Sequence, residues 1–179
     1  MPTLNEVIDP IKAQLTTAKT KFLADDVAMN QVKTELQSLA STLETNQSSL
    51  VQIDDQTRIE QKLGINNLLP ITELNRKTFA SGVDQASAGI FLTTYNLKVN
   101  ELKRIRSEMD YNSKEAELIA AILEYSGGNA ALLAVHVPVR PVGISARVYR
   151  PTLLKTLEIE ITVLAKRITD IDPTLFIAP

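Results

Sequence analysis

Apolar side chains recur along the first third of the chain at steps of three and four residues. This is the a and d spacing of a heptad repeat, in which one face of a helix meets a partner helix. About seven heptads with only two polar interruptions predict a long coiled-coil helix over residues 1–63. The a positions are Ile8, Leu15, Phe22, Met29, Leu36, Leu43 and Leu50, and the d positions are Leu4, Ile11, Ala18, Asp25, Val32, Leu39, Asn46 and Ile53. We call these positions the first seam.

The length of this helix predicts either an elongated chain or a break near its start. A helix of about 50 residues would be roughly 75 Å long, whereas a compact domain of this size has a radius of gyration near ~16 Å. Pro10 is the expected place for a break. Asp9 could cap a helix that has Pro10 in its first position, or Thr3 and Glu6 could form a capping box for an earlier helix that kinks at Pro10.

The residue types of the first seam bear on the number of partner helices. Leucine at a positions with the β-branched Ile11, Val32 and Ile53 at d positions favours three or four helices over a parallel dimer. Asp25 and Asn46 cost stability there and could fix the register, as a buried asparagine does in coiled coils. The sequence therefore predicts a homo-oligomer, with a trimer or higher favoured. The alternative is that the seam is partnered by another helix of the same chain and that its polar positions face solvent.

Residues 64–94 are expected to form a turn and a helical connector rich in small residues. Gly64 to Pro70 reads as a turn, and Thr72 and Asp84 are candidate helix caps. The small residues either permit close helix approach or mark flexible structure; they are Ala80, Ser81, Gly82, Ala86, Ser87, Ala88 and Gly89.

A second heptad helix is predicted over residues 95–126, ending at Ser126 before Gly127 and Gly128. Its pattern begins at Phe91 and Tyr95 and misses at Lys98. We call the following positions the second seam: Leu102, Ile105, Met109, Asn112, Ile119 and Leu123. Two helices with the same pattern, separated by a turn, suggest a helical hairpin or paired layers of a bundle.

The chain then changes character. Residues 127–150 carry alternating valines and several prolines, which predict an extended segment and exclude a helix. No acidic residue occurs between Glu124 and Glu158, so Arg140, Arg147 and Arg150 form a candidate docking arm for an acidic protein or a phosphate backbone. The alternative is an ordered loop whose arginines pair with acidic faces of the same chain.

Residues 151–179 are expected to form a C-terminal helix opened by Pro151, followed by an apolar docking tail. The helix pattern consists of Leu154, Leu157, Ile161, Leu164, Ile168 and Ile171. The tail carries Leu175, Phe176 and Ile177, and we expect it to dock on its own bundle or on a neighbouring subunit, because exposed apolar patches are unfavourable in water.

The amino-acid composition excludes several kinds of chemical site. The 179 residues are 44% hydrophobic but only 4% aromatic, which fits aliphatic helix packing, and the net charge of -2 does not indicate a generally basic nucleic-acid-binding surface. The absence of cysteine excludes disulfides and thiolate sites, and one histidine, His136, cannot supply a two-histidine metal site. Glu101, Glu108 and Glu115 lie at seven-residue steps, which we interpret as a solvated stripe. We expect no catalytic residues, no cofactor and no bound metal.

The sequence predicts an all-α fold: an elongated helical hairpin or coiled coil with an extended Pro/Val/Arg segment and a C-terminal helix. The expected function is that of a non-enzymatic structural or adaptor protein that self-associates within a larger assembly, such as a virion, tail or fibre part. The alternative is a helical-bundle binding module that engages an acidic protein or nucleic acid through Arg140 to Arg150. A third class, a hairpin chaperone, would expose apolar tips near Ile65 to Ile71. No signal peptide or membrane span is predicted, so synthesis in the cytoplasm is expected.

Overall fold

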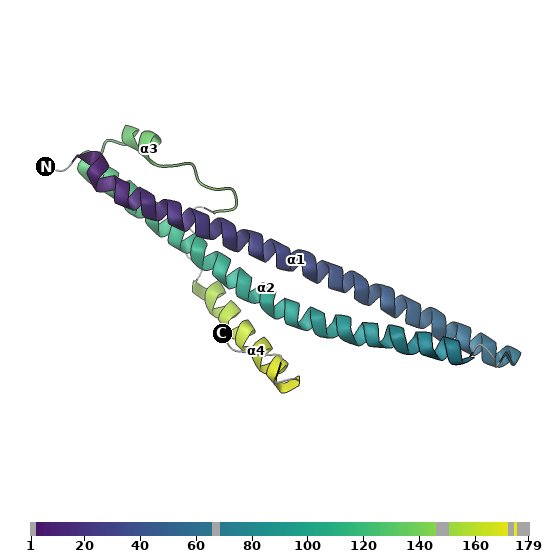
Figure 1. Ribbon diagram of the computed structural model, residues 1–179. Coiled ribbons are helices and arrows are strands. Elements are labelled where there is room, and N and C mark those ends of the chain that lie inside the picture. The colour runs from purple at the N-terminus through teal and green to yellow at the C-terminus, as the bar shows by residue number, and fades with distance from the viewer. Residues whose placement is uncertain (1–2, 66–68, 146–150, 172–173, 175–179) are drawn as a thin grey trace. The chain divides into compact units, whose positions relative to one another are not determined.

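The computed structural model describes residues 3–65, 69–145, 151–171 and 174, with the backbone alone described for residues 69–71. All regular secondary structure in these residues is helical. The elements, in chain order, are α1 (Leu4–Leu63), α2 (Leu69–Tyr125), α3 (Ala131–His136) and α4 (Pro151–Ile171) (Figure 1). The prediction of an all-α fold is confirmed.

The start of α1 is the capping box that Thr3 and Glu6 predict. The Thr3 backbone N–H donates to Glu6 Oε2 at 2.6 Å, and the Glu6 backbone N–H donates to Thr3 Oγ1 at 3.4 Å. These hydrogen bonds lower the pKa of Glu6, with the bond from the Thr3 backbone contributing most. α1 then continues through Pro10, so the break expected there is wrong. Proline removes a single backbone donor near the helix end, and the buried Ile8 and Leu15 anchor the helix on both sides of it.

α2 begins at Leu69, well before residue 95, where the second heptad helix was predicted to start. It is continuous across residue 94, so Thr72 and Asp84 lie inside the helix and cap nothing. Its C-terminus follows the prediction: α2 ends at Tyr125, and Gly127 and Gly128 have positive φ angles of 63° and 92°. The Gly128 backbone N–H donates to the Leu123 carbonyl at 2.8 Å, which closes the last turn.

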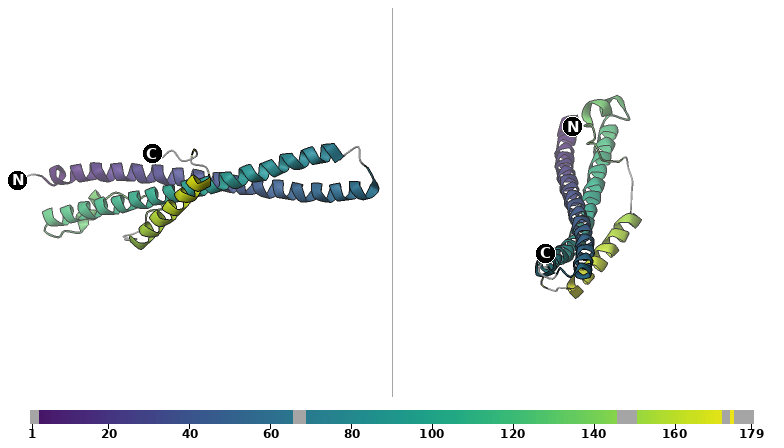
Figure 2. Two further views of the ribbon diagram at one scale, coloured as in Figure 1. Left: turned by 90° about the horizontal axis from the view of Figure 1, so that it is seen from below. Right: turned by 90° about the vertical axis from the view of Figure 1, so that its right-hand side faces the viewer.

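The chain divides into two units that we describe separately. Unit 1 comprises Met1–Asn30 and Lys98–Val163, and unit 2 comprises Gln31–Leu97 and Leu164–Pro179. In each unit a segment of α1 lies antiparallel to a segment of α2 (Figure 2). In unit 1, Asp25 and Asp26 of α1 bond to Ser107 and Arg104 of α2.

In unit 2 the pairs of residues that meet also run in opposite directions along the two helices. Glu60 of α1 meets Thr72 of α2, and Asp54 meets Arg76. Further along α2, a Cβ on Gly82 would lie 2.7 Å from Asn46 Nδ2, and a Cβ on Gly89 would lie 3.2 Å from Leu39 Cδ2. The small residues of α2 therefore permit close helix approach, one of the two interpretations that the sequence left open.

The core of unit 1 has a third layer over the helix pair. Buried side chains of α1 and α2 form one cluster with Ile144, and Leu132, Leu133 and Val137 pack against it. The buried members from the two long helices are Ile8, Leu15, Ala18, Phe22, Tyr111, Leu118 and Ile122. α3 and the following extended segment thus cover this part of the hairpin.

The helix α3 corrects the prediction that residues 127–150 exclude a helix. Ala131 to His136 is helical because alanine and leucine have high helix propensity, and the chain becomes extended only at Val137, immediately before Pro138. Val137 has φ -87° and ψ 120°. The residues from Val137 to Ser145 contain no helix or strand, as the prolines indicate.

Candidate functional site

The first seam is buried to different extents in the two units. In unit 1, Ile8, Leu15, Ala18, Phe22 and Met29 are at most 8% exposed. In unit 2 every first-seam position is only half-buried; these positions are Val32, Leu36, Leu39, Leu43, Asn46, Leu50 and Ile53. In unit 1 the seam meets other parts of the same chain, and in unit 2 Leu39 and Asn46 lie against Gly89 and Gly82 of α2. Both contacts fit the intramolecular alternative that the sequence left open, and the unit 2 positions keep partial exposure beside it.

The second seam lies beside the most buried face of α2. Its members Leu102, Ile105, Met109, Asn112, Ile119 and Leu123 are all half-buried. The fully buried face is displaced by one or two positions and carries Ser107, Tyr111, Leu118 and Ile122. Lys98, which keeps the register of the second seam, binds Glu160 of α4 at 3.1 Å. This part of the second seam therefore lies toward α4, and the neighbouring face lies toward α1.

α4 presents the apolar face that its sequence predicts. Leu157 and Ile168 are each 4% exposed, and Leu154, Ile161 and Leu164 are half-buried. Ile171 keeps the spacing but is 75% exposed. In unit 1, Arg106 of α2 binds Glu158 on the polar edge of α4 at 2.7 Å.

Polar groups of unit 1 join α1 to α2 beneath the covering segment. Ser107 Oγ donates to the Asp25 carboxylate, and Arg104 Nε donates to the Asp26 carboxylate. The Arg104 guanidinium also lies 5.0 Å from the centre of the Phe22 ring, a cation–π distance. Asp25 is thus a polar seam position whose partner comes from the same chain.

The extended segment after α3 is bound by the same side of α2. Arg104 Nη2 donates to the Gly143 carbonyl at 3.1 Å, and Asn112 Nδ2 donates to the Ser145 carbonyl at 3.3 Å. Glu108 Oε1 accepts from the Ser145 backbone N–H at 2.8 Å and from the Ser145 hydroxyl at 2.6 Å. Four side-chain hydrogen bonds therefore fix residues 143–145 on α2.

Glu115 and Arg140 form a hydrogen-bonded ion pair between α2 and the extended segment. Arg140 Nε donates to both Glu115 carboxylate oxygens, at 2.7 and 2.9 Å, and Arg140 Nη2 donates to Oε2. The side chain of Glu115 is 6% exposed and that of Arg140 is 28% exposed. The hydrogen bonds to Glu115 raise the pKa of Arg140 above its ordinary value. We call Arg104, Ser107, Glu108, Glu115, Arg140 and Ser145, with Asp25 and Asp26, the polar clasp.

These contacts correct the interpretation of the glutamates as a solvated stripe. Glu108 and Glu115 are buried, and only Glu101, which lies 3.5 Å from Lys98, keeps 27% of its side chain exposed. Arg140, the partner of Glu115, lies 25 residues away in sequence, and Ser145, the partner of Glu108, lies 37 residues away. The interpretation is wrong because the spacing of residues within one helix does not reveal such distant partners. A buried charge is tolerated when it is paired and hydrogen-bonded.

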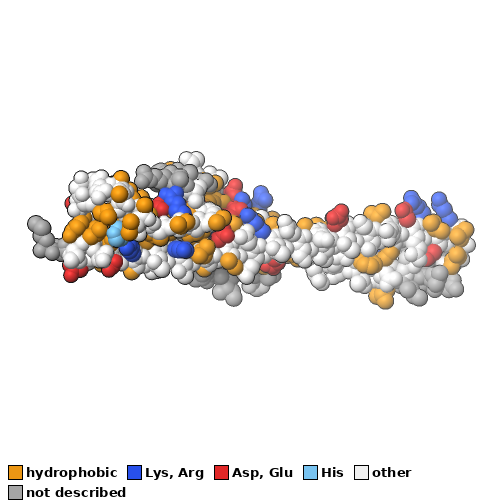
Figure 3. Space-filling view, turned by 90° about the horizontal axis from the view of Figure 1, so that it is seen from above, with side chains coloured by type: hydrophobic (Ala, Val, Ile, Leu, Met, Phe, Trp, Pro, Cys, Tyr) orange, Lys and Arg blue, Asp and Glu red, His pale blue; other side chains and the backbone are white. Residues whose placement is uncertain are grey.

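The predicted docking arm is accordingly engaged within the chain at Arg140. At Arg140 the structure agrees with the alternative, an ordered loop whose arginines pair with acidic faces of the same chain, because Arg140 pairs with Glu115 of α2. Arg147 and Arg150 lie outside the described residues. His136 is half-buried, and its Nδ1 lies 3.3 Å from Lys12 Nζ. Figure 3 shows hydrophobic side chains gathered around this histidine.

As well as Asn112 Oδ1, which has no hydrogen-bond partner among the described residues, Tyr111 is an exception in a region where most polar groups are paired. Its side chain is fully buried, and its hydroxyl has no hydrogen-bond partner among the described residues. Burial raises the pKa of Tyr111, and the Glu115 carboxylate raises it further, while Arg140 opposes them. The hydroxyl thus loses its hydration on folding and gains no hydrogen bond from the described residues.

We expect Tyr111→Phe to stabilise the protein by about 1 kcal/mol at neutral pH, because it removes a buried group without a partner. The raised pKa means that the folded state keeps the phenol proton where the unfolded state loses it. The proton on Tyr111 therefore adds its full contribution to the free energy of unfolding below about pH 10, and this contribution is lost as pH rises through the folded-state pKa. Urea unfolding at pH 7 and above pH 10 checks this: the advantage of the variant should grow with pH, and a less stable variant at pH 7 would contradict it.

Among the described residues, no group of three or more histidine, aspartate or glutamate side chains is placed to hold a metal ion. None of the described helices combines the length and apolar character needed to cross a membrane. Comparison with family models, with curated proteins and with solved structures finds no match.

Proposed function

We propose that this protein is a non-enzymatic structural or adaptor protein that self-associates through the first seam of unit 2. The observation that carries the proposal is the difference in burial between the units. In unit 1 a third layer covers the helix pair, and first-seam residues such as Leu15 and Phe22 are at most 1% exposed. In unit 2 all seven first-seam positions from Val32 to Ile53 keep partial exposure.

Half-buried leucines at regular spacing are suited to a further helix layer. Completing the burial of such a side chain is worth about 1 kcal/mol, roughly half the value for burying it fully. Leu36, Leu39, Leu43 and Leu50 repeat this gain along one stripe of α1. A second copy of the chain presents the same stripe, so the contact can be self-complementary.

The helix pairing within the chain also bears on stoichiometry. The residue types of the first seam favour three or four helices, and each chain supplies α1 and α2 to the same unit. Two chains therefore suffice for a core of four helices, as in dimers of helical hairpins. We propose such a dimer as the basic unit of a larger assembly, with a virion, tail or fibre part as the class of role. The support for that class is the length of the helices.

Light scattering coupled to size-exclusion chromatography tests the proposal. We expect a mass of about twice 19.7 kDa that persists at high salt, because apolar contacts respond weakly to ionic strength. A mass of 19.7 kDa at all concentrations would contradict self-association. A mass that falls steeply as salt rises would indicate charge-driven association instead.

We expect the double variant Leu36→Asp with Leu43→Asp to abolish the dimer, because an unpaired carboxylate is poorly tolerated in an aliphatic contact. The variant Leu36→Ala with Leu43→Ala keeps helix propensity and should weaken the dimer at least tenfold while circular dichroism stays unchanged. Val51→Asp is the matched control, since Val51 lies on the same helix and is 63% exposed. Unchanged dimerisation in the alanine variant would show that the seam is misassigned.

A further inference from the structure

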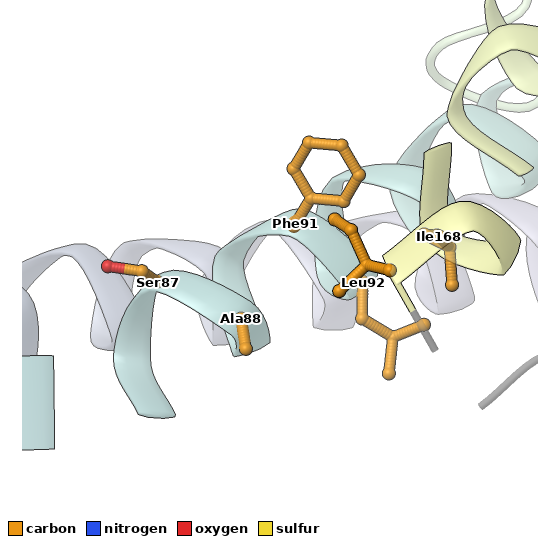
Figure 4. Close-up of a pocket in the computed structure, with 6 residues that line it drawn as sticks. Ser87, Ala88, Phe91, Leu92 and Ile168 are labelled. Carbon is orange, nitrogen blue, oxygen red and sulfur yellow. The ribbon is translucent and has the colours of Figure 1, made fainter. Parts of the chain in front are cut away.

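An apolar groove in unit 2 lies between α2 and the end of α4. Its volume is about 260 Å³, and it is lined by Ser87, Ala88, Phe91, Leu92, Ile168 and Ile171 (Figure 4). Ile168 forms a buried wall, whereas Ile171, the last residue of α4, is 75% exposed at the edge. Ser87 is the one polar residue of this lining.

Because the groove is lined mainly by apolar side chains, it suits an uncharged apolar occupant. The residues that follow α4 in the chain form an uncharged apolar segment of this kind. Residues 173–179, the predicted docking tail, lie outside the described residues apart from Thr174. They read Pro-Thr-Leu-Phe-Ile-Ala-Pro and carry no charged side chain. Phe176 is only five residues beyond Ile171, which itself lines the groove. An extended chain covers roughly 3.3–3.6 Å per residue, so Phe176 can lie up to about 18 Å from Ile171, which leaves it within reach of the groove that Ile171 lines.

The size of the groove fits the tail as well as its polarity does. A cavity of about 150 Å³ accommodates a benzene ring, so a groove of about 260 Å³ has room for the Phe176 ring and part of a neighbouring aliphatic side chain. A segment joined to the groove by a short linker has an effective concentration in the millimolar range, which favours it over the same segment of another molecule.

We propose that this groove binds the C-terminal peptide of its own chain, with Phe176 seated against Phe91 and Leu92. The tail then acts as an intramolecular cover for an apolar surface of unit 2. This proposal does not depend on self-association, because the tail and the groove belong to the same molecule.

The absence of cysteine from the chain makes a cross-linking test direct. In the full-length protein, Ser87→Cys is combined with Ala178→Cys, which leaves Phe176 in place, and the thiols are joined with a short bismaleimide. We expect a cross-link within one monomer. The matched control combines Thr78→Cys with Ala178→Cys, because Thr78 is exposed on α2 but lies about 14 Å further along the helix than Ser87.

Phe176→Ser in the Ser87→Cys/Ala178→Cys background should slow the cross-link at least tenfold without changing helicity. Equal cross-linking at Thr78 and Ser87, or products that join two chains, would overturn the proposal. The latter result would assign the groove to a second copy.

Truncation after Asp172 gives an independent readout with a hydrophobic dye. Removing the tail should raise dye fluorescence at least twofold, and a synthetic peptide of residues 173–179 should reverse the rise. Dye binding that is unchanged by truncation would show that the tail does not cover the groove.

Discussion

Phe22→Ala is expected to destabilise unit 1 by about 4 kcal/mol. Phe22 is fully buried within the cluster that contains Leu118 and Ile122. Truncating a buried phenylalanine costs about 3–5 kcal/mol, because transfer energy is lost and a cavity remains. The ring also lies under the Arg104 guanidinium, and loss of that cation–π contact adds about 1 kcal/mol.

Urea unfolding followed by circular dichroism measures this loss, and the neighbouring residue provides the control. Leu23 follows Phe22 on α1 but is 42% exposed, so Leu23→Ala should cost less than about 1 kcal/mol. Equal losses at the two positions would mean that the buried face of α1 is misplaced. A large loss for Phe22→Ala alone would support the burial of the first seam in unit 1. The proposed function depends on the contrast between this burial and the half-burial of the first seam in unit 2.

The apolar periodicity was sufficient to locate the buried face of α1 in unit 1 and that of α4. Leu15, Phe22, Leu157 and Ile168 keep helical spacing, and all four are buried. Such positions are predictable because a helix has one apolar face, and hydrophobic burial depends mainly on the side chain itself. The capping box of Thr3 and Glu6 was one of two helix starts that the sequence offered, because both residues lie within one turn. The other start, at Asp9 and Pro10, is wrong, since both residues lie inside α1.

The polar clasp could not be located in this way. Reading the chain as apolar and polar positions assigns Glu108 and Glu115 to solvent, and their burial depends on Ser145 and Arg140, which come from a remote segment. The signal available in the sequence was complementary charge. Glutamates at seven-residue steps precede a long segment without acidic residues that carries Arg140. That signal identifies the partners only when the segment is known to fold back on α2.

The extent of α2 was missed for a different physical reason. Gly82 and Gly89 lower helix propensity, which suggested a connector over residues 64–94. In the structure a Cβ at either position would contact Asn46 or Leu39 of α1 closely. Close packing against α1 therefore accounts for glycine at positions where an isolated helix would be weakened.

Arg140→Ala is the second prediction with a large effect, and we expect a loss of about 3 kcal/mol. It leaves the carboxylate of Glu115, whose side chain is 6% exposed, without its charged partner. Removing one member of a buried ion pair costs about 3–5 kcal/mol, and the lower end applies because the Arg140 side chain is 28% exposed. Urea unfolding of the full chain at neutral pH measures the loss.

The reverse truncation should cost less, which separates a buried ion pair from a general packing defect. Glu115→Ala leaves the long Arg140 side chain, which can extend to water, so we expect about 1–2 kcal/mol. In the double variant Glu115→Met with Arg140→Met, neither charge remains, and the stability should return to within about 1 kcal/mol of the wild type. Equal losses in the two alanine variants, or an additive loss in the methionine pair, would show that shape rather than charge holds residues 137–145 on α2.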